Sequence, residues 1–380
     1  MKKIPFGKPI IDQKEKKEVN KVLSGPILVH GKKIINFEKN FSKYVGSKYS
    51  VAVSSCTAGM HMIYFGLGFK KGDEVIVPAQ THVATAHAAE LAGAKVVFVD
   101  SNNENGNVDV NLIIKKITSK TKAIAVVHYL GNIVDLKKLK LIAKKKKIFL
   151  LEDCALSLGA KKNNLHTGLF GDAGVFSFYP VKHITTSEGG MVITNNKKLS
   201  EKLKKLRAFG IDRDHSKRKI PGYYNALQLG FNYRMSEINA AIGIQQLRKI
   251  NNFLKIRKRN FFYMESKFSF LNNYLKVIPA SKNNSSYYCL SIILQKNYNQ
   301  YRLSLINYLK KNGIGTSIYY PVPVPMMSYY QKKYKYKKNQ YKNAINISDN
   351  SIAFPIGPHI TTKDINYIYK KLSIFLRKLI

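Results

Sequence analysis

Short apolar runs alternate with amphipathic segments through the first two thirds of the chain. Residues 72–79 (Gly-Asp-Glu-Val-Ile-Val-Pro-Ala) and 93–100 (Gly-Ala-Lys-Val-Val-Phe-Val-Asp) flank a helix-like stretch, which is the spacing of a parallel strand–helix–strand unit. A second cycle follows, with apolar runs at 123–128 and 148–151 around a helical period. Two more strands are predicted at the end of this region, at 175–178 and 191–194. Nearly continuous apolar strands alternating with helices predict an α/β fold with a buried, mostly parallel sheet.

The alternation weakens beyond about residue 250, where Asn, Tyr and Lys become more frequent. Residues 236–262 predict a long helix, because Ser236 is a good N-cap and the charge of Glu237 suits the first turn. We therefore expect a large domain over residues 1–250 and a smaller C-terminal α+β domain over residues 251–380. Ligands of such sheets bind beyond the carboxyl ends of the strands, so polar residues that follow the strands are the candidates for chemistry.

The charge balance is strongly basic. The 380 residues include 64 Lys and Arg against 22 Asp and Glu, a net charge of +42, which raises the possibility of nucleic-acid binding. Nucleic-acid binders usually concentrate this charge on one face or motif. Here lysine is spread along the chain, without a zinc-finger, basic-zipper or RNA-recognition signature. We therefore interpret most of the charge as solvated lysine faces and expect no nucleic-acid partner.

Other features of the composition narrow the class of protein. The hydrophobic content of 45% is enough for a sizeable globular core. The odd number of cysteines (Cys56, Cys154 and Cys289) suggests reduced thiols rather than a disulfide framework. No apolar run is long enough for a membrane helix, and the N-terminus lacks the apolar part of a secretory signal. We expect a cytoplasmic protein without membrane insertion and without a metal.

Four segments at predicted strand or helix ends carry candidate chemistry. Residues 54–61 could offer backbone N–H groups to an anion, or could simply cap a helix. Asp153 ends a very apolar strand, and a buried carboxylate needs a partner, either a protonated ring nitrogen or a nearby Lys or Arg. Lys182 lies in a Pro-, Gly- and Thr-rich turn between two strands, where a lowered pKa would favour a Schiff base. Asn232 and Arg234 precede the long helix, where an ordinary capped loop is the alternative.

Taken together, and in their order along the chain, the four segments resemble those of the nucleotide-sugar aminotransferases of the DegT/StrS type. These are fold-type I enzymes that depend on pyridoxal 5'-phosphate (PLP). The resemblance covers about residues 22–259, and it includes the Glu-Asp-Cys-Ala motif at 152–155 and the Asn-Tyr-Arg-Met-Ser-Glu-Ile motif at 232–238. It implies that Lys182 holds PLP as an internal aldimine and moves protons between substrate and cofactor. It also implies that Asp153 pairs with the pyridine nitrogen and keeps the ring an electron sink.

The resemblance implies further cofactor contacts. Thr57 and Ala58 would bind the phosphate mainly through backbone N–H groups, and Ser177 would add a hydroxyl. His82 occupies the position where the family stacks an aromatic ring on PLP, although a surface histidine is the alternative. Asn232 matches a residue that reaches the phosphate of the neighbouring subunit, which implies a homodimer with shared active sites.

Some positions depart from the family pattern. Many members have Gln near the phenolic oxygen of the cofactor where this chain has Leu156, so another donor serves that oxygen or the electronics differ. Many also have Gly in place of Cys56. Basic residues of a later loop could contact a diphosphate or be ordinary surface charges: Arg213, Arg218 and Lys219.

The resemblance implies a two-step transamination. Glutamate would donate its amino group, and a nucleotide-diphosphate keto-sugar would accept it for surface glycan biosynthesis. Dehydrating relatives have histidine in place of the lysine, so Lys182 favours amination. The segment 184–190 is similar to enzymes that aminate the 4-keto position of 6-deoxy sugars, including perosamine-type synthases. A 3-keto-sugar aminotransferase and a non-catalytic, PLP-binding regulatory homologue are the alternatives.

Overall fold

The computed structural model describes residues 3–212, 220 and 223–379. Its central feature is a seven-stranded sheet. Its strands are β1 (Tyr49–Val53), β2 (Glu74–Pro78), β3 (Lys95–Val99), β4 (Thr121–Val127), β5 (Phe149–Asp153), β8 (Ala173–Ser177) and β9 (Gly190–Thr194). Their spatial order is β1-β9-β8-β5-β4-β2-β3, so β5 lies in the middle.

Most neighbouring strands in this sheet are parallel, as the sequence predicts. Strand β9 is the exception, because it pairs antiparallel with both β1 and β8. The start of β9 therefore lies at the same edge as the carboxyl ends of the parallel strands. The turn that carries Lys182 leaves β8 and enters β9, so it stays at this edge throughout. This reversal was not expected from the apolar pattern, which is the same for either strand direction.

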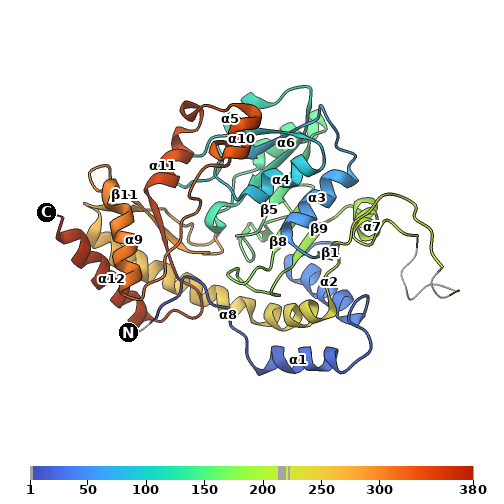
Figure 1. Cartoon of the computed structure of the whole chain (residues 1–380), viewed down its shortest axis with the longest axis horizontal. Helices are drawn as coiled ribbons and strands as arrows, with labels where there is room; N and C mark the ends of the chain where they lie inside the picture. Colours follow the sequence, from blue (N-terminus) through green and yellow to red (C-terminus); the bar gives the residue numbers. More distant parts are fainter. Residues whose placement is uncertain (1–2, 213–219, 221–222, 380) are drawn as a thin grey trace.

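Helices cover both faces of the sheet (Figure 1). The helices on one face are α3 (Cys56–Gly66), α4 (Val83–Leu91) and α7 (Lys197–Leu206). Those on the other face are α2 (Lys32–Val45), α5 (Val110–Lys116), α6 (Lys137–Lys146) and α8 (Glu237–Phe268). Burial on both faces explains why the strands read as continuous apolar runs rather than as alternating patterns.

Helix α8 (32 residues) runs below the large sheet from near α2 toward the C-terminal region beside α12 (Figure 1). Ser236 caps it by accepting a hydrogen bond from the Asn239 N–H at 3.1 Å, and Glu237 lies in its first turn, as predicted. Helix α1 (Gln13–Leu23) and α2 pack against its first part. Its last part contributes Phe261, Met264 and Phe268 to a separate C-terminal core.

The C-terminal region contains a small antiparallel sheet of β10 (Leu275–Val277), β11 (Leu290–Leu294) and β12 (Ser351–Phe354). Helices α9 (Arg302–Lys311) and α12 (Thr362–Arg377) join this core. The predicted division at residue 250 stays a prediction, since α8 runs through that position without interruption. None of the helices in the described part of the chain is both long and apolar enough to cross a membrane.

One C-terminal segment returns to the large sheet. It includes α10 (Ser328–Tyr334) and α11 (Lys342–Asn350), and its Tyr330 and Ala344 belong to the core under α3 and α4. The Tyr330 hydroxyl hydrogen-bonds His87 Nδ1 on α4 at 2.8 Å. The residues that lead into this segment, Tyr319 and Tyr320, are thereby brought to the edge where the strands of the large sheet end.

Candidate active site

Asp153 is the last residue of the central strand β5, and its side chain is buried. Its Oδ2 accepts a hydrogen bond from the Thr85 hydroxyl at 2.7 Å, and its Oδ1 accepts one from the Ala155 N–H at 3.0 Å. Because the Thr85 hydrogen is given to Asp153, the Thr81 hydroxyl at 2.8 Å donates to Thr85 Oγ1. Helix α4 therefore orients the carboxylate through Thr85. The negative charge of Asp153 remains available to pair with a bound cation.

Lys182 lies in the turn between β8 and β9, and its side chain is half-buried. Its Nζ is 5.3 Å from the centre of the Tyr288 ring, a cation–π distance. Desolvation lowers the pKa of Lys182 from its ordinary value, and the negative charge of Asp153 partly opposes this shift. A lowered pKa increases the fraction of neutral amine, which is the form that attacks a carbonyl carbon.

The start of helix α3 faces the same edge of the sheet. Ser55 is its N-cap and accepts a hydrogen bond from the Ala58 N–H at 3.0 Å. The N–H groups of the first turn, including that of Thr57, have no partner within the helix and are suited to an anion. Of the two predicted phosphate-binding residues, Ala58 thus already has an internal partner, and Thr57 is the better placed donor.

A glycine allows this helix to approach the sheet. A Cβ atom on Gly190 would lie 2.6 Å from the backbone nitrogen of Cys56, so any side chain there would force α3 away from β9. Ser177, at the end of β8, is the register partner of Gly190 and is half-buried. The structure thus brings the start of α3, Ser177 and the Lys182 turn to one edge of the sheet.

His82 is the N-cap of α4 and accepts a hydrogen bond from the Ala84 N–H at 3.2 Å. Its ring is exposed and lies 5.9 Å from the ring of Tyr320, edge to face. The pKa of His82 is lowered mainly by desolvation. The positive charge of Lys182 lowers this pKa further, whereas the negative charge of Asp153 raises it. The imidazole is therefore close enough to interact electrostatically with both Lys182 and Asp153.

Asn232 is exposed and pairs with Ala208 in an isolated antiparallel bridge. The next residue, Tyr233, accepts a hydrogen bond from the Ser54 N–H at 2.8 Å, which holds this segment beside the end of β1. Leu156 is buried in an apolar cluster with Tyr129 and Tyr288. The other basic candidates, Arg213, Arg218 and Lys219, lie outside the described residues.

Three site residues were missed by the sequence reasoning. Thr85 orients Asp153 from 68 positions away, and Tyr288 and Tyr320 approach the site from the C-terminal region. Thr85 had a weak local signal, because it is one helical turn beyond His82 on a helix that starts at the carboxyl end of a strand. The two tyrosines had none, since only tertiary packing distinguishes them from the other 22 tyrosines among the 24 of the chain.

Comparison with known proteins identifies the class of this site. The sequence profile described as the DegT/DnrJ/EryC1/StrS aminotransferase family matches residues 9–373. The chain belongs to this family. The predicted resemblance, the α/β fold and the enzyme class, a sugar aminotransferase, are thereby confirmed.

Individual relatives cover nearly the whole chain. GDP-perosamine synthase of Escherichia coli O157:H7 is 35% identical over 377 residues, 99% of each chain. The UDP-4-amino-4,6-dideoxy-N-acetyl-beta-L-altrosamine transaminase of Campylobacter jejuni is 33% identical over 379 residues, 99% of this chain and 98% of the relative. The structure of Helicobacter pylori PseC, an aminotransferase involved in the biosynthesis of pseudoaminic acid, superposes with a TM-score of 0.92 at 28% identity, covering 98% of this chain and 99% of that one.

Membership of this family implies PLP as the cofactor, and the residues of the site fit it. Asp153 is a buried carboxylate suited to a protonated ring nitrogen. Because Gly190 has no side chain, α3 can lie close to β9 and thus to Ser177. The first turn of α3 offers N–H groups to a phosphate.

Proposed function

We propose that this enzyme converts a nucleotide-diphosphate-linked 4-keto-6-deoxy sugar to the corresponding amino sugar, with glutamate as the amino donor, for surface glycan biosynthesis. The observation that carries the proposal is that a lysine of lowered pKa and a buried carboxylate lie at the same carboxyl edge of the sheet. The name of the Campylobacter jejuni relative includes a 4-amino-4,6-dideoxy sugar, which supports an amino group at carbon 4, and the Escherichia coli relative is named as a perosamine synthase, the type that the sequence resembles. From the sequence we place the reaction in the cytoplasm.

In this proposal, Lys182 would hold PLP covalently until the amine of the donor takes its place, and the freed amine of Lys182 would then move the proton. When bound, PLP supplies an electron sink that stabilises negative charge on the adjacent substrate carbon. The neutral amine of Lys182 takes the proton from the donor carbon and returns one to the carbon that receives the amino group. The carboxylate of Asp153 would keep the ring nitrogen protonated. Thr85 fixes the orientation of that carboxylate.

The phosphate and ring contacts complete the proposed site. Thr57 and Ser177 would hold the phosphate, with Ala58 in the same turn already bonded to Ser55, and His82 would cover one face of the ring. Asn232 reaches the phosphate bound to a second copy of the chain, which makes the enzyme a homodimer. Its exposed position supports this role, because an exposed amide is available to another chain.

Exposed apolar side chains support the dimer. They are concentrated between α1 and α2 and in the segment before Asn232: Leu23, Ile27, Leu28, Val29, Ile35, Phe209, Ile220, Tyr223, Tyr224, Leu227 and Leu229. The first segment lies beside residues that flank the second, since Val29, Ile35, Ala208 and Arg234 line one hollow. Apolar surface gathered in this way marks an interaction site rather than scattered exposure.

The first test addresses the covalent cofactor. The purified enzyme supplied with PLP should show a visible absorbance band, and borohydride reduction should fix the cofactor to the peptide that contains Lys182. Lys182→Ala should lose both signals, whereas Lys147→Ala, a change at an exposed lysine, should keep them. Fixation on any other lysine would overturn the assignment of Lys182.

The second test addresses the substrate. A panel of GDP- and UDP-linked 4-keto and 3-keto sugars is incubated with the holoenzyme and glutamate, and the products are read by mass spectrometry. We expect the replacement of oxygen by an amino group with 4-keto sugars. Conversion of 3-keto sugars alone would assign the enzyme to the alternative subclass, and a lack of conversion throughout would contradict an amination role.

A further inference from the structure

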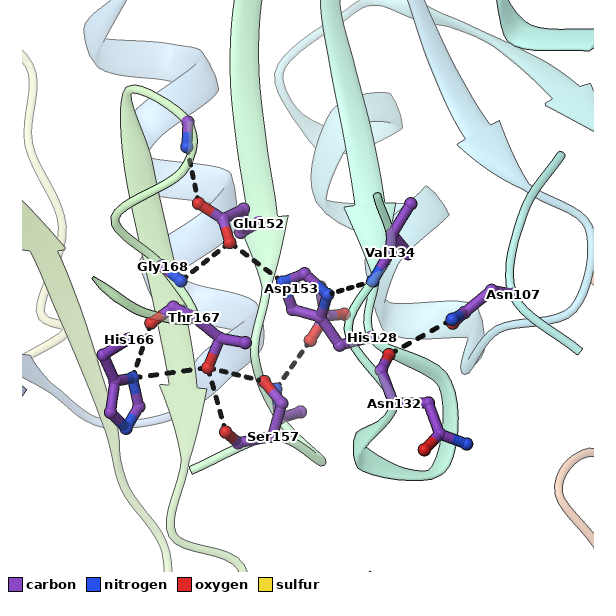
Figure 2. Close-up of polar contacts among 12 residues, drawn as sticks. Asn107, His128, Asn132, Val134, Glu152, Asp153, Ser157, His166, Thr167 and Gly168 are labelled. Atoms are coloured by element: carbon purple, nitrogen blue, oxygen red, sulfur yellow. Dashed lines mark hydrogen bonds and ion pairs between the residues drawn. The ribbon is translucent and has the colours of Figure 1, made fainter. Parts of the chain in front are cut away.

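A second polar cluster lies behind the candidate active site. Glu152 and His128 are fully buried, and successive residues of a strand point to opposite faces, so Glu152 points away from the side on which Asp153 meets Thr85. Figure 2 shows the carboxylate of Glu152 between His128, which follows β4, and the loop that contains Gly168. This cluster is not used by the proposed chemistry.

All hydrogen-bonding groups of the pair have partners. Glu152 Oε2 accepts from His128 Nε2 at 2.9 Å and from the Gly168 N–H at 2.8 Å, and Oε1 accepts from the Gly171 N–H at 2.6 Å. His128 Nδ1 accepts from the Val134 N–H at 3.1 Å, so the proton is on Nε2 and the imidazole is neutral. Three donors around one carboxylate suit its ionised form.

The same residues could be mistaken for a metal site. Ligand atoms of His128, Glu152 and Cys154 lie within 4.8 Å of one another. However, both ring nitrogens of His128 and both oxygens of Glu152 are already engaged in hydrogen bonds. Burial raises the pKa of the Cys154 thiol well above its usual value, and the charge of Glu152 adds to this, which disfavours the thiolate that a metal requires. The cluster is therefore a hydrogen-bonded hub.

The partners of the hub lead to three parts of the active site. Glu152 is adjacent to Asp153 in β5, and the Gly168–Gly171 loop leads into β8 and thus to Ser177. On the other side, His128 begins a turn whose Leu130 and Gly131 carbonyls accept hydrogen bonds from the Tyr288 and Ser286 N–H groups, at 3.3 and 3.2 Å.

The connection continues to the lysine turn. The Ser286 carbonyl accepts a hydrogen bond from His183 Nε2 at 3.1 Å, and the ring of Tyr288 lies below Lys182 Nζ. Glu152 and His128 therefore hold the end of β5, which carries Asp153. Through the turn after His128 they also hold the segment with Ser286 and Tyr288, which contacts Lys182 and His183.

We propose that Glu152, acting with His128, is a positioning residue that sets the relative placement of Asp153, Ser177 and the Tyr288 loop around the cofactor. This inference rests on the proposed function, because it takes Lys182 and Asp153 as the cofactor-binding groups. An amide in place of the carboxylate would present an N–H group to the N–H donors of His128, Gly168 or Gly171, so at least one of these contacts must open.

The test compares Glu152→Gln with Glu74→Gln. Glu74 is also a buried carboxylate of the same sheet, but it lies at the amino end of β2 and contacts the Thr118 hydroxyl at 2.6 Å. Both proteins are checked for native circular dichroism. We expect Glu152→Gln to weaken PLP binding about tenfold, by analogy with outer-sphere partners of metal ligands, and to shift the absorbance maximum of the bound cofactor. Glu74→Gln should leave both properties unchanged.

A second pair of variants covers the case in which Glu152→Gln does not fold. His128→Gln can still donate to Glu152 and accept from Val134, whereas His128→Leu can do neither. Cofactor affinity should be retained in the first and lost in the second. Wild-type affinity and absorbance in Glu152→Gln or in His128→Leu, or an equal change in Glu74→Gln, would overturn the positioning role. Absence of a cofactor band in the wild-type enzyme would instead contradict the proposed function.

Discussion

The Thr85 hydroxyl donates a hydrogen bond to Asp153 Oδ2 at 2.7 Å, across the space between helix α4 and strand β5. The bond holds the carboxylate in one rotamer, and each carboxylate oxygen keeps a lone pair for another donor. It also couples the position of His82, at the start of the same helix, to the orientation of Asp153. A cofactor that touches both residues would meet a preformed geometry rather than two independent side chains.

Removing this hydroxyl should weaken cofactor binding. A hydrogen bond to a charged group contributes about 1.5–3 kcal/mol, and Thr85→Val keeps the shape of the side chain while it removes the donor. We expect the dissociation constant of PLP, measured by absorbance titration, to rise about ten- to hundredfold. Thr85→Ser retains the donor and should restore most of the affinity, and failure of this rescue would mean that packing rather than hydrogen bonding is responsible.

Gly190→Ala should separate α3 from β9. The added methyl group would lie 2.6 Å from the Cys56 nitrogen, far inside a normal contact. Overpacking of this kind costs about 1–3 kcal/mol, measurable by urea unfolding, and the affinity for PLP should fall with it because the predicted phosphate-binding turn moves. Gly25→Ala is the matched control, since its nearest neighbour would be 3.6 Å away. Equal effects of the two changes would contradict the close approach.

The buried His166 should make stability depend on pH. Burial lowers the pKa of His166 from 6.5 to about 4, and its ring accepts from the Gly159 N–H and donates to the Thr167 carbonyl, which requires the neutral form. Below pH 6.5 the unfolded chain binds a proton that the folded chain does not, so stability is complete above that pH and is lost as the pH falls toward 4.

The corresponding loss is about 3 kcal/mol for a pKa difference of this size. It should be visible as a difference between urea unfolding free energies at pH 7 and pH 4. His166→Gln can make the same two hydrogen bonds without titrating, so this part of the pH dependence should vanish. A slope identical to that of the wild type would show that other groups are responsible.

Mixed dimers should reveal whether active sites are shared. Lys182→Ala and Asn232→Ala proteins are each expected to be nearly inactive. In a mixed dimer, the site with an intact Lys182 receives an intact Asn232 from the other subunit, so mixing the two variants after mild dissociation should restore part of the activity. No recovery, with mixed dimers demonstrated by differently tagged subunits, would place Asn232 in the site of its own chain.

Local patterns were sufficient for the strands of the large sheet, and they pointed to the main candidate residues, whose roles stay a prediction. The apolar runs that form β2, β4 and β5 are continuous because both faces of the sheet are covered. A strand buried on both faces can therefore be recognised as a run of apolar residues in the sequence. Lys182 and Asp153 became candidates because they follow such runs. The direction of β9 could not be found, since reversing a strand leaves its composition unchanged.

Contacts between distant residues escaped prediction for a different reason. Glu152 and His128 both lie at predicted strand ends, yet which of the surrounding N–H groups they meet depends on loops whose course no period reveals. The return of α10 and α11 to the large sheet was missed because their Tyr- and Lys-rich sequence carries no long apolar pattern. Polar satisfaction and packing, rather than propensity, decide such contacts.

The reversed strand β9 also bears on the order in which the site can assemble. Its pairing with β8 joins residues close in sequence, with Ser177 opposite Gly190, whereas its pairing with β1 joins distant ones, with Val53 opposite Gly190. Short loops close at lower entropic cost than long ones. The lysine turn can therefore form early as a local hairpin. The start of α3, which follows β1, reaches it only when β1 pairs with β9 across 137 residues, as for Val53 and Gly190, so the lysine turn and Ser177 would come together before α3 docks beside them.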